Sequence, residues 1–139
     1  SYARFDYSDL RTSAPGLPTA DGEIEISVTI TNASARAGDE VAQLYVRQKV
    51  ASRSRPVRQL KAFEKVRLEA GARRTVTFRL TSADLGYHDD DGRLVIEPGP
   101  FDVFVGGSAT AALTTRFALT GPMLVATLPL VRAVGVTGR

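Results

Sequence analysis

Apolar and polar residues alternate with a period of two through much of this 139-residue chain. From Ile24 to Ile30 every second residue is a β-branched apolar residue, and the residues between them are charged or hydroxylated. Successive side chains of a β-strand point to opposite faces of a sheet, whereas an amphipathic helix needs an apolar period of 3.6 residues. The pattern therefore predicts a half-buried strand. The same test predicts further strands at residues 39–47, 73–80, 101–105 and 115–119.

Sequences typical of tight turns separate these segments, for example Asp91-Gly92 and Gly106-Gly107. Short strands joined by such turns indicate an all-β sandwich or barrel. An immunoglobulin domain proper would carry a Cys…Trp…Cys pattern, and this chain has neither residue type. We therefore expect a fibronectin III/immunoglobulin-like β-sandwich of about seven antiparallel strands, of the fibronectin kind. Residues 60–68 fit either a helix or a bulged strand.

The length of the chain fits one domain, and 43% apolar and 24% charged residues are the proportions of a globular protein. We place this domain at residues 1–120. Residues 121–139 have no strand pattern with an evident partner, so we expect a tail or linker there. The longest nearly apolar stretch, residues 123–136, is too short to span a bilayer. With neither an initiator Met nor a leader in view, we expect a processed or excised piece.

The inventory of reactive side chains excludes several kinds of site. The chain has no cysteine, which excludes a thiol nucleophile, a zinc–thiolate site and an iron–sulfur cluster. Its single histidine, His88, excludes a multi-histidine metal site within one chain.

Positive charge is concentrated in one segment. The net charge is +3, but the stretch from Arg47 to Lys61 holds six basic residues and no acidic one. Outside it, residues 1–120 contain ten basic and fifteen acidic residues. Such a segment can dock on an acidic protein surface, remain solvated, or contact nucleic acid. It has no aromatic residue that could stack on bases, so we favour docking on an acidic surface of a sibling domain.

Four motifs in order carry a family resemblance. They are TNxxxxxGDEVxQLYV at residues 31–46, RPVxxLKxFxKVxL at 55–68, Gly71 with TVxF at 75–78 and Asp84-Leu85, and EPGxFxVxVG at 97–106. Together they resemble the fibronectin type III-like domain at the C-terminus of family 3 glycoside hydrolases, such as β-glucosidases and β-xylosidases. The opening residues 1–8 resemble the first strand of that domain. The chain departs from the family at Ala62, where a glycine is usual, and at Leu94, where an aromatic residue is frequent.

The resemblance implies a module without chemistry of its own. In the family the nucleophile aspartate and the acid/base glutamate lie in a barrel domain and an α/β domain, so we expect no catalytic, cofactor-binding or metal-binding residue here. We expect the partners to be those two catalytic domains, and neither nucleic acid nor a membrane. The residues that we expect to make or support the interdomain contact are Arg55, Pro56, Arg58, Leu60 and Phe63, together with Asp39 and Tyr45.

Other polar motifs have simpler interpretations. Ser8-Asp9-Leu10 is similar to the sequence around the family nucleophile but falls in an N-terminal edge strand. Asp39 and Glu40 begin a strand and would point to opposite faces, which is unsuitable for paired-carboxylate chemistry. The acidic sequence at residues 88–92 is expected to be a solvated hairpin turn, with a calcium site as the alternative. Asn32-Ala33-Ser34 is a formal glycosylation acceptor, which we expect to be unmodified.

Two rival functions are left open. A free-standing carbohydrate- or protein-binding module would require exposed aromatic residues, for which Tyr2, Tyr7 and Tyr87 are the candidates. A small hydrolase in its own right would turn over an aryl β-glucoside as the isolated chain.

Overall fold

The computed structural model describes residues 3–49 and 57–126, within which the chain forms eleven strands and one short 3-10 turn. The long strands are β1 (Phe5–Thr12), β3 (Glu23–Asn32), β4 (Gly38–Gln48), β5 (Gln59–Leu68), β6 (Arg73–Thr81), β9 (Gly99–Gly106) and β10 (Thr114–Thr120). The short elements are β2 (Gly16–Pro18), the turn η1 (Ala83–Leu85), β7 (Tyr87–His88), β8 (Leu94–Ile96) and β11 (Leu124–Ala126).

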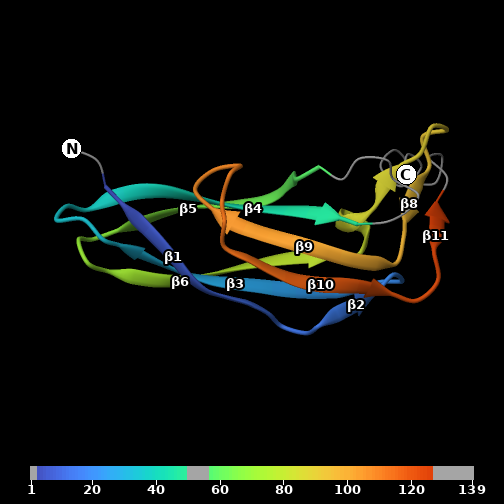
Figure 1. The fold of residues 1–139 in the computed structure, drawn as a ribbon, viewed down its shortest axis with the longest axis horizontal. Coiled ribbons are helices and arrows are strands. Elements are labelled where there is room, and N and C mark those ends of the chain that lie inside the picture. Colours follow the sequence, from blue (N-terminus) through green and yellow to red (C-terminus); the bar gives the residue numbers. More distant parts are fainter. Residues whose placement is uncertain (1–2, 50–56, 127–139) are drawn as a thin grey trace, which may run out of the picture.

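These strands form two main layers that share one long axis (Figure 1). One layer is a three-stranded sheet of order β1-β3-β6, and the other is a five-stranded sheet of order β2-β10-β9-β4-β5. Neighbouring long strands are antiparallel, and β2 runs parallel to β10. A small third sheet of order β11-β8-β7 lies at one end of the sandwich.

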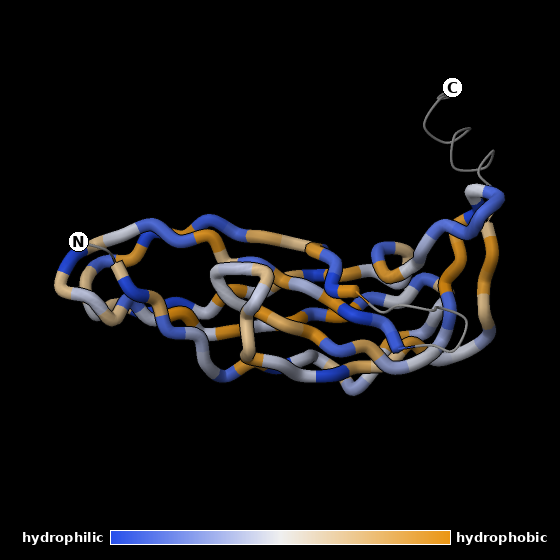
Figure 2. Tube along the Cα trace, turned by 45° about the horizontal axis from the view of Figure 1, so that its top comes forward, coloured by the Kyte–Doolittle hydropathy of each residue, from blue (hydrophilic) through white to orange (hydrophobic). Residues whose placement is uncertain are grey.

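The core lies between the two main layers because each long strand turns alternate residues inward. In β3 the four apolar residues from Ile24 to Ile30 are at most 1% exposed, while Glu23 and Glu25 face solvent. The alternation is visible along the strands as changes from hydrophobic to hydrophilic colour (Figure 2). In the five-stranded sheet, Phe101 and Phe117 stack with their ring centroids 5.2 Å apart. Apolar burial of this kind stabilises a fold by about 25 cal/mol per Å².

The expected fold class is confirmed. Seven strands contain seven residues or more, and the segment at residues 60–68 is a bulged strand rather than a helix. Its bulge opposes the pair Leu44–Tyr45 to three residues of β5, so that Lys61 is the extra residue. Turns after β5 and β7 place Gly71 at φ 74° and Gly92 at φ 79°, conformations that glycine adopts without a steric cost.

The sequence pattern did not predict four short strands, namely β2, β7, β8 and β11. Of these, β11 lies beyond residue 120 and pairs with β8 through Val125 opposite Val95. The hydroxyl of Thr19 also donates a hydrogen bond to the carbonyl of Pro122 at 2.7 Å. The division of the chain at residue 120 stays a prediction. Within the described ranges, no helix is long and apolar enough to cross a membrane.

Candidate functional site

The outer surface of the five-stranded sheet brings together side chains from four strands, and we call this surface the five-stranded face. Residues that pair directly across antiparallel strands point to the same side of a sheet. Tyr45 is paired with both Leu60 and Phe104, so these three lie on the outer side. By the same register the outer side also carries Gln43 and Arg47 on β4, Phe63 on β5, Asp102 on β9, and Thr114 and Arg116 on β10.

The β5 side of this face is apolar and accessible. Phe63 is 61% exposed and Leu60 is 49% exposed, although both belong to the hydrogen-bonded strand β5. Val57, which precedes β5, is also well exposed. Because the bulge at Lys61 inserts one residue between them, Leu60 and Phe63 point to the same side. The face therefore offers a patch of large apolar side chains that the described residues leave exposed.

Phe104 lies at the centre of the face and is covered by guanidinium groups. The guanidinium carbon of Arg58 is 3.5 Å from the centroid of the Phe104 ring, and that of Arg47 is 5.1 Å away. Arg58 is held in place because it donates hydrogen bonds to the carbonyls of Ala109 and Ala111 at 2.9 and 2.8 Å. Cation–π contacts of this kind attract through the negative face of the ring. Arg58 therefore joins the start of β5 to β9 and to the loop that follows β9.

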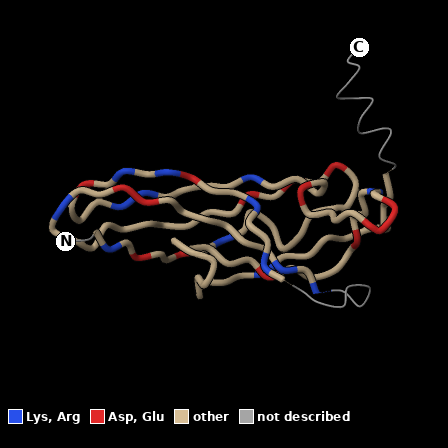
Figure 3. The backbone as a smooth tube through the Cα atoms, turned by 90° about the horizontal axis from the view of Figure 1, so that it is seen from above, with Lys and Arg blue, Asp and Glu red and all other residues tan. Residues whose placement is uncertain are grey.

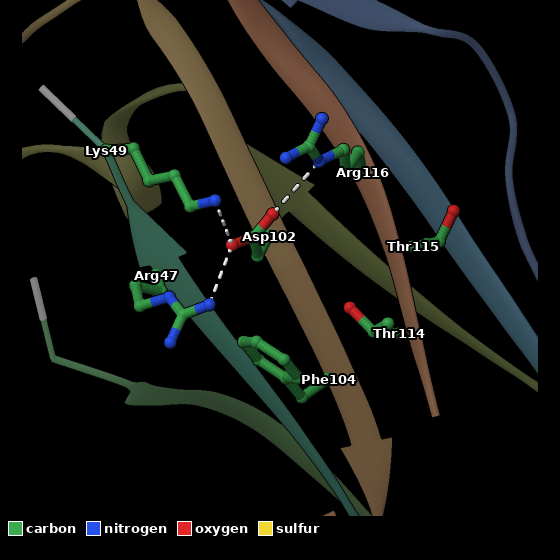
Figure 4. Close-up of a pocket in the computed structure, with 7 residues that line it drawn as sticks. All are labelled: Arg47, Lys49, Asp102, Phe104, Thr114, Thr115 and Arg116. Carbon is green, nitrogen blue, oxygen red and sulfur yellow. Dashed lines mark hydrogen bonds and ion pairs between the residues drawn. The ribbon is translucent and has the colours of Figure 1, made fainter. Parts of the chain in front are cut away.

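Asp102 is a nearly buried carboxylate that binds three cations (Figure 4). Its side chain is 8% exposed, and its oxygens accept hydrogen bonds or ion pairs from Arg47 at 2.9 Å, Lys49 at 3.2 Å and Arg116 at 3.2 Å. Burial pushes the pKa of the Asp102 carboxyl upward, but the three cations together outweigh burial and hold the pKa below its ordinary value. Asp102 is therefore charged at neutral pH.

The structure gathers most, but not all, of the residues expected at a contact. Tyr45, Leu60 and Phe63 lie on the five-stranded face, and Arg58 supports it through Phe104. Asp39 is at the opposite end of β4, six residues and about 20 Å from Tyr45. It is highly exposed and pairs with Arg67 at 3.1 Å. Arg55 and Pro56 lie outside the described residues. The contact role of all these residues stays a prediction.

Sequence reasoning missed Asp102, Phe104 and Arg116. The alternation at residues 101–105 predicts the strand from its inward residues and assigns no role to the residues between them. A signal was present, since the outward positions of that strand are a lone acidic residue and a phenylalanine rather than the usual small polar residues. The cations that bind Asp102 come from β4, the residue after it and β10, which only the sheet register places next to β9, and Arg58 reaches Phe104 from the residue before β5.

The acidic motifs elsewhere have structural roles. Asp9 occupies the bulge of β1 with φ 58° and pairs with Arg11 at 2.7 Å. In the acidic turn, at the end of the molecule where Figure 3 shows acidic residues gathered, Asp89 accepts hydrogen bonds from the backbone N–H groups of Asp91 and Arg93. Within residues 3–49 and 57–126, no group of three or more His, Asp or Glu residues is arranged to hold a metal ion.

Asn32, the last residue of β3, is the most buried polar residue among those that the structure describes. It is 0% exposed, and its amide nitrogen donates hydrogen bonds to the carbonyls of Arg36 and Leu68 at 2.8 and 3.0 Å. Its amide oxygen accepts hydrogen bonds from the N–H and the hydroxyl of Ser34. The Asn32 side chain of the formal glycosylation motif is therefore hydrogen-bonded within the fold and is inaccessible to a modifying enzyme in the folded chain.

The tyrosines do not form an exposed patch in the part of the chain that the structure describes. Tyr7 is half-buried and donates a hydrogen bond to Glu40 at 2.7 Å; burial, more than this bond, raises the pKa of its phenol. Tyr87 is half-buried and donates to Glu97 at 2.6 Å. Tyr2 lies outside the described residues. Among the aromatic residues that the structure describes, the well-exposed one is Phe63 rather than a tyrosine.

The profile of the fibronectin type III-like domain family matches residues 40–109. Together with the sandwich and its register, this match shows that the chain belongs to that family. Its relatives are glycosidases. A periplasmic β-glucosidase of Salmonella typhimurium is 42% identical over 106 residues, which cover 76% of this chain and 14% of that enzyme. A β-xylosidase of Formosa agariphila is 37% identical over 111 residues, or 80% of this chain and 15% of that enzyme.

Solved structures give the same result. A β-glucosidase from Erythrobacter marinus superposes with a TM-score of 0.79 at 35% identity, covering 85% of this chain and 16% of that one. The β-glucosidase of Listeria innocua in complex with gluconolactone superposes with a TM-score of 0.76 at 40% identity, covering 88% and 17%. The chain thus corresponds to about one sixth of these family 3 glycoside hydrolases, and the catalytic domains of these enzymes have no counterpart in it.

Proposed function

We propose that this chain is a non-catalytic accessory module of a β-glucosidase-like family 3 glycoside hydrolase in carbohydrate degradation. It docks through its five-stranded face on the catalytic domains and stabilises their relative position. The barrel and α/β domains are its partners, and its work is physical rather than chemical.

The distribution of exposed apolar side chains carries this proposal. Among the described residues, six large apolar side chains are well exposed, and none of them lies on β1, β3 or β6. Leu60 and Phe63 project from the five-stranded face, and Val57 adjoins it. Concentrated apolar exposure marks a surface that another protein covers. The relatives supply a reason for a partner, because about five sixths of each lies outside the matched region.

The test replaces the apolar patch in two contexts. Leu60→Thr with Phe63→Thr keeps strand propensity and removes only exposed apolar surface. In the isolated chain we expect the free energy of unfolding to change by less than about 0.5 kcal/mol, because neither side chain is in the core. In the full-length enzyme we expect a loss of about 2 kcal/mol or more, which is the effect of truncating buried interface anchors. Denaturant unfolding of both proteins measures the difference.

A matched control on the other layer is Thr75→Ala with Thr77→Ala, which removes exposed side chains from β6. Its effect on the free energy of unfolding should be the same in the isolated chain and in the full-length enzyme. Equal effects of the apolar replacement in both contexts would remove the docking proposal. Oligosaccharide binding by the isolated chain that depends on Phe63 would instead establish a free-standing binding module. Aryl β-glucoside turnover that survives purification of the isolated chain to homogeneity would make the chain an enzyme.

A further inference from the structure

The five-stranded face contains an open depression of about 530 Å³ beside Asp102, which we call the Asp102 notch. The side chains that matter in it are Arg47, Lys49, Asp102, Phe104, Thr114 and Arg116 (Figure 4). The notch is large enough to admit a side chain together with its flanking backbone, and it lies on the same face as the apolar patch of Leu60 and Phe63.

Charge in the notch is unbalanced. Asp102 is the acidic residue of the notch, and Arg47, Lys49 and Arg116 all lie within 3.2 Å of its oxygens. One carboxylate neutralises one cation, so two positive charges are left in excess. Arg58, stacked on Phe104, adds a further cation at the edge. An excess of this kind attracts anions and repels basic surfaces.

The three cations also have hydrogen-bonding capacity left over. Arg116 binds Asp102 through Nε, and its two terminal nitrogens make no hydrogen bond to the described residues. Arg47 binds through one terminal nitrogen, while its buried Nε has no hydrogen-bond partner within the same residues. A guanidinium carries five N–H donors in a fork that matches a carboxylate. The notch is thus preformed for a second acceptor that brings negative charge.

Its walls are fixed before any partner arrives. Phe104 is 6% exposed because Arg58 covers its ring, and Arg58 is held by the carbonyls of Ala109 and Ala111. Asp102 contacts all three cations, of which Arg47 is the least exposed. A preorganised site loses little conformational entropy on binding, so a charge-assisted hydrogen bond formed there is more favourable than one between mobile surface side chains.

We propose that the Asp102 notch receives carboxylate side chains, Asp or Glu, from the catalytic domains of the same enzyme. This inference rests on the proposed docking function and adds the chemistry of the partner surface: an acidic cluster that lies beside an apolar patch. An acidic protein surface fits better than nucleic acid, because the cations converge on one notch rather than following a track of evenly spaced phosphates.

Carbodiimide coupling provides a direct test, because it joins an amine to a carboxylate when the two are in contact. In the isolated chain, Lys49 should couple to Asp102, whose oxygen is 3.2 Å from its ammonium nitrogen. In the full-length enzyme we expect a second product, in which Lys49 is joined to an Asp or Glu outside residues 1–139. Mass spectrometry of the digested protein identifies both products. Lys65, which is exposed on β5, serves as the reference for how readily an accessible lysine couples.

Salt and substitutions separate this contact from docking in general. Salt at about 1 M shortens the screening length to about 3 Å, so the yield of the second product should fall several-fold. Lys49→Arg keeps the positive charge but has no amine, so it should abolish the second product and lower the full-length unfolding midpoint less than Lys49→Met does. Lys49→Met should lower that midpoint and reduce its dependence on salt, with a smaller change in the isolated chain.

Each outcome has one meaning. If replacing Leu60 and Phe63 destabilises the full-length enzyme but Lys49 couples only to Asp102, the module docks and the acidic contact is overturned. If replacing Leu60 and Phe63 has no effect in the full-length enzyme, the docking function itself fails. If the isolated chain binds single-stranded DNA and Lys49→Met abolishes that binding, the notch is a phosphate site and the acidic-protein assignment is overturned.

Discussion

The charged side chains on the two outer faces of the sandwich are paired in different ways. On the three-stranded face the ion pairs are separate two-residue contacts at the surface: Arg79 pairs with Glu23, Arg11 with Asp9 and Arg4 with Asp6. On the five-stranded face three cations converge on one nearly buried carboxylate. Accessible apolar side chains accompany the unbalanced charge and are absent from the balanced face. The two faces therefore differ in both charge and apolar exposure, and the proposed docking on the five-stranded face requires both differences.

The largest difference between charged residues should appear at Asp102. We expect Asp102→Ala to lower the free energy of unfolding of the isolated chain by about 2 kcal/mol, because it leaves three crowded cations without their counter-ion. Asp39→Ala is the matched control, since Asp39 belongs to the same sheet but is exposed and pairs with a single arginine. It should have little effect. Equal losses would contradict the special role of the Asp102 cluster.

The pH dependence of unfolding shows whether the stability lost in Asp102→Ala comes from the charge of Asp102. The folded pKa of Asp102 lies below its unfolded value, so its contribution is complete above the unfolded pKa of about 3.9 and is lost as the pH falls through the folded pKa. The stability of the wild-type chain should therefore fall over that acidic range more steeply than that of Asp102→Ala. Parallel curves over the same range would assign the loss in the variant to packing rather than to charge.

A smaller effect of opposite sign is expected at Lys61, at the edge of the five-stranded layer. Burial lowers the pKa of Lys61 from its ordinary value of 10.5, although the nearby Asp84 carboxylate opposes the change. Because the folded chain disfavours the charged amine, Lys61→Met should stabilise the isolated chain by up to about 1 kcal/mol near neutral pH, after allowance for its partial exposure. The gain should shrink as the pH rises toward 10.5 and the wild-type amine loses its proton.

Lys61→Met also tests whether Lys61 prevents self-association through β5. The strand β5 is an edge of its sheet, and a bulge with a half-buried lysine discourages a second chain from pairing with that edge. We therefore expect Lys61→Met to self-associate at high concentration in sedimentation measurements, while Lys65→Met, at a regular position of the same strand, does so less. A monomeric and more stable Lys61→Met chain would leave Lys61 without this protective role.

The long strands could be predicted from the sequence because the alternation that defines each of them is local. A bulged strand was one of two predicted alternatives for residues 60–68, but the pattern of Phe63, Val66 and Leu68 did not place the bulge at Lys61 or turn Phe63 outward. The strands β2, β8 and β11 contain three residues each, too few to display a period of two. The Asp102 cluster joins residues 47, 49, 102 and 116, and nothing local in the sequence reveals the register that brings them together.

The smallest effect is expected on the three-stranded face, where it tests the whole comparison. Arg79 and Glu23 form a two-point contact at 3.2 and 2.7 Å, but both side chains are more than half exposed. Exposed pairs of this kind contribute little because water and salt screen them. The double replacement Arg79→Ala with Glu23→Ala should therefore leave the unfolding midpoint unchanged in the isolated chain and in the full-length enzyme. A midpoint that fell only in the full-length enzyme would mean that the partner covers the balanced face, and docking would have to be reassigned from the five-stranded layer to β3 and β6.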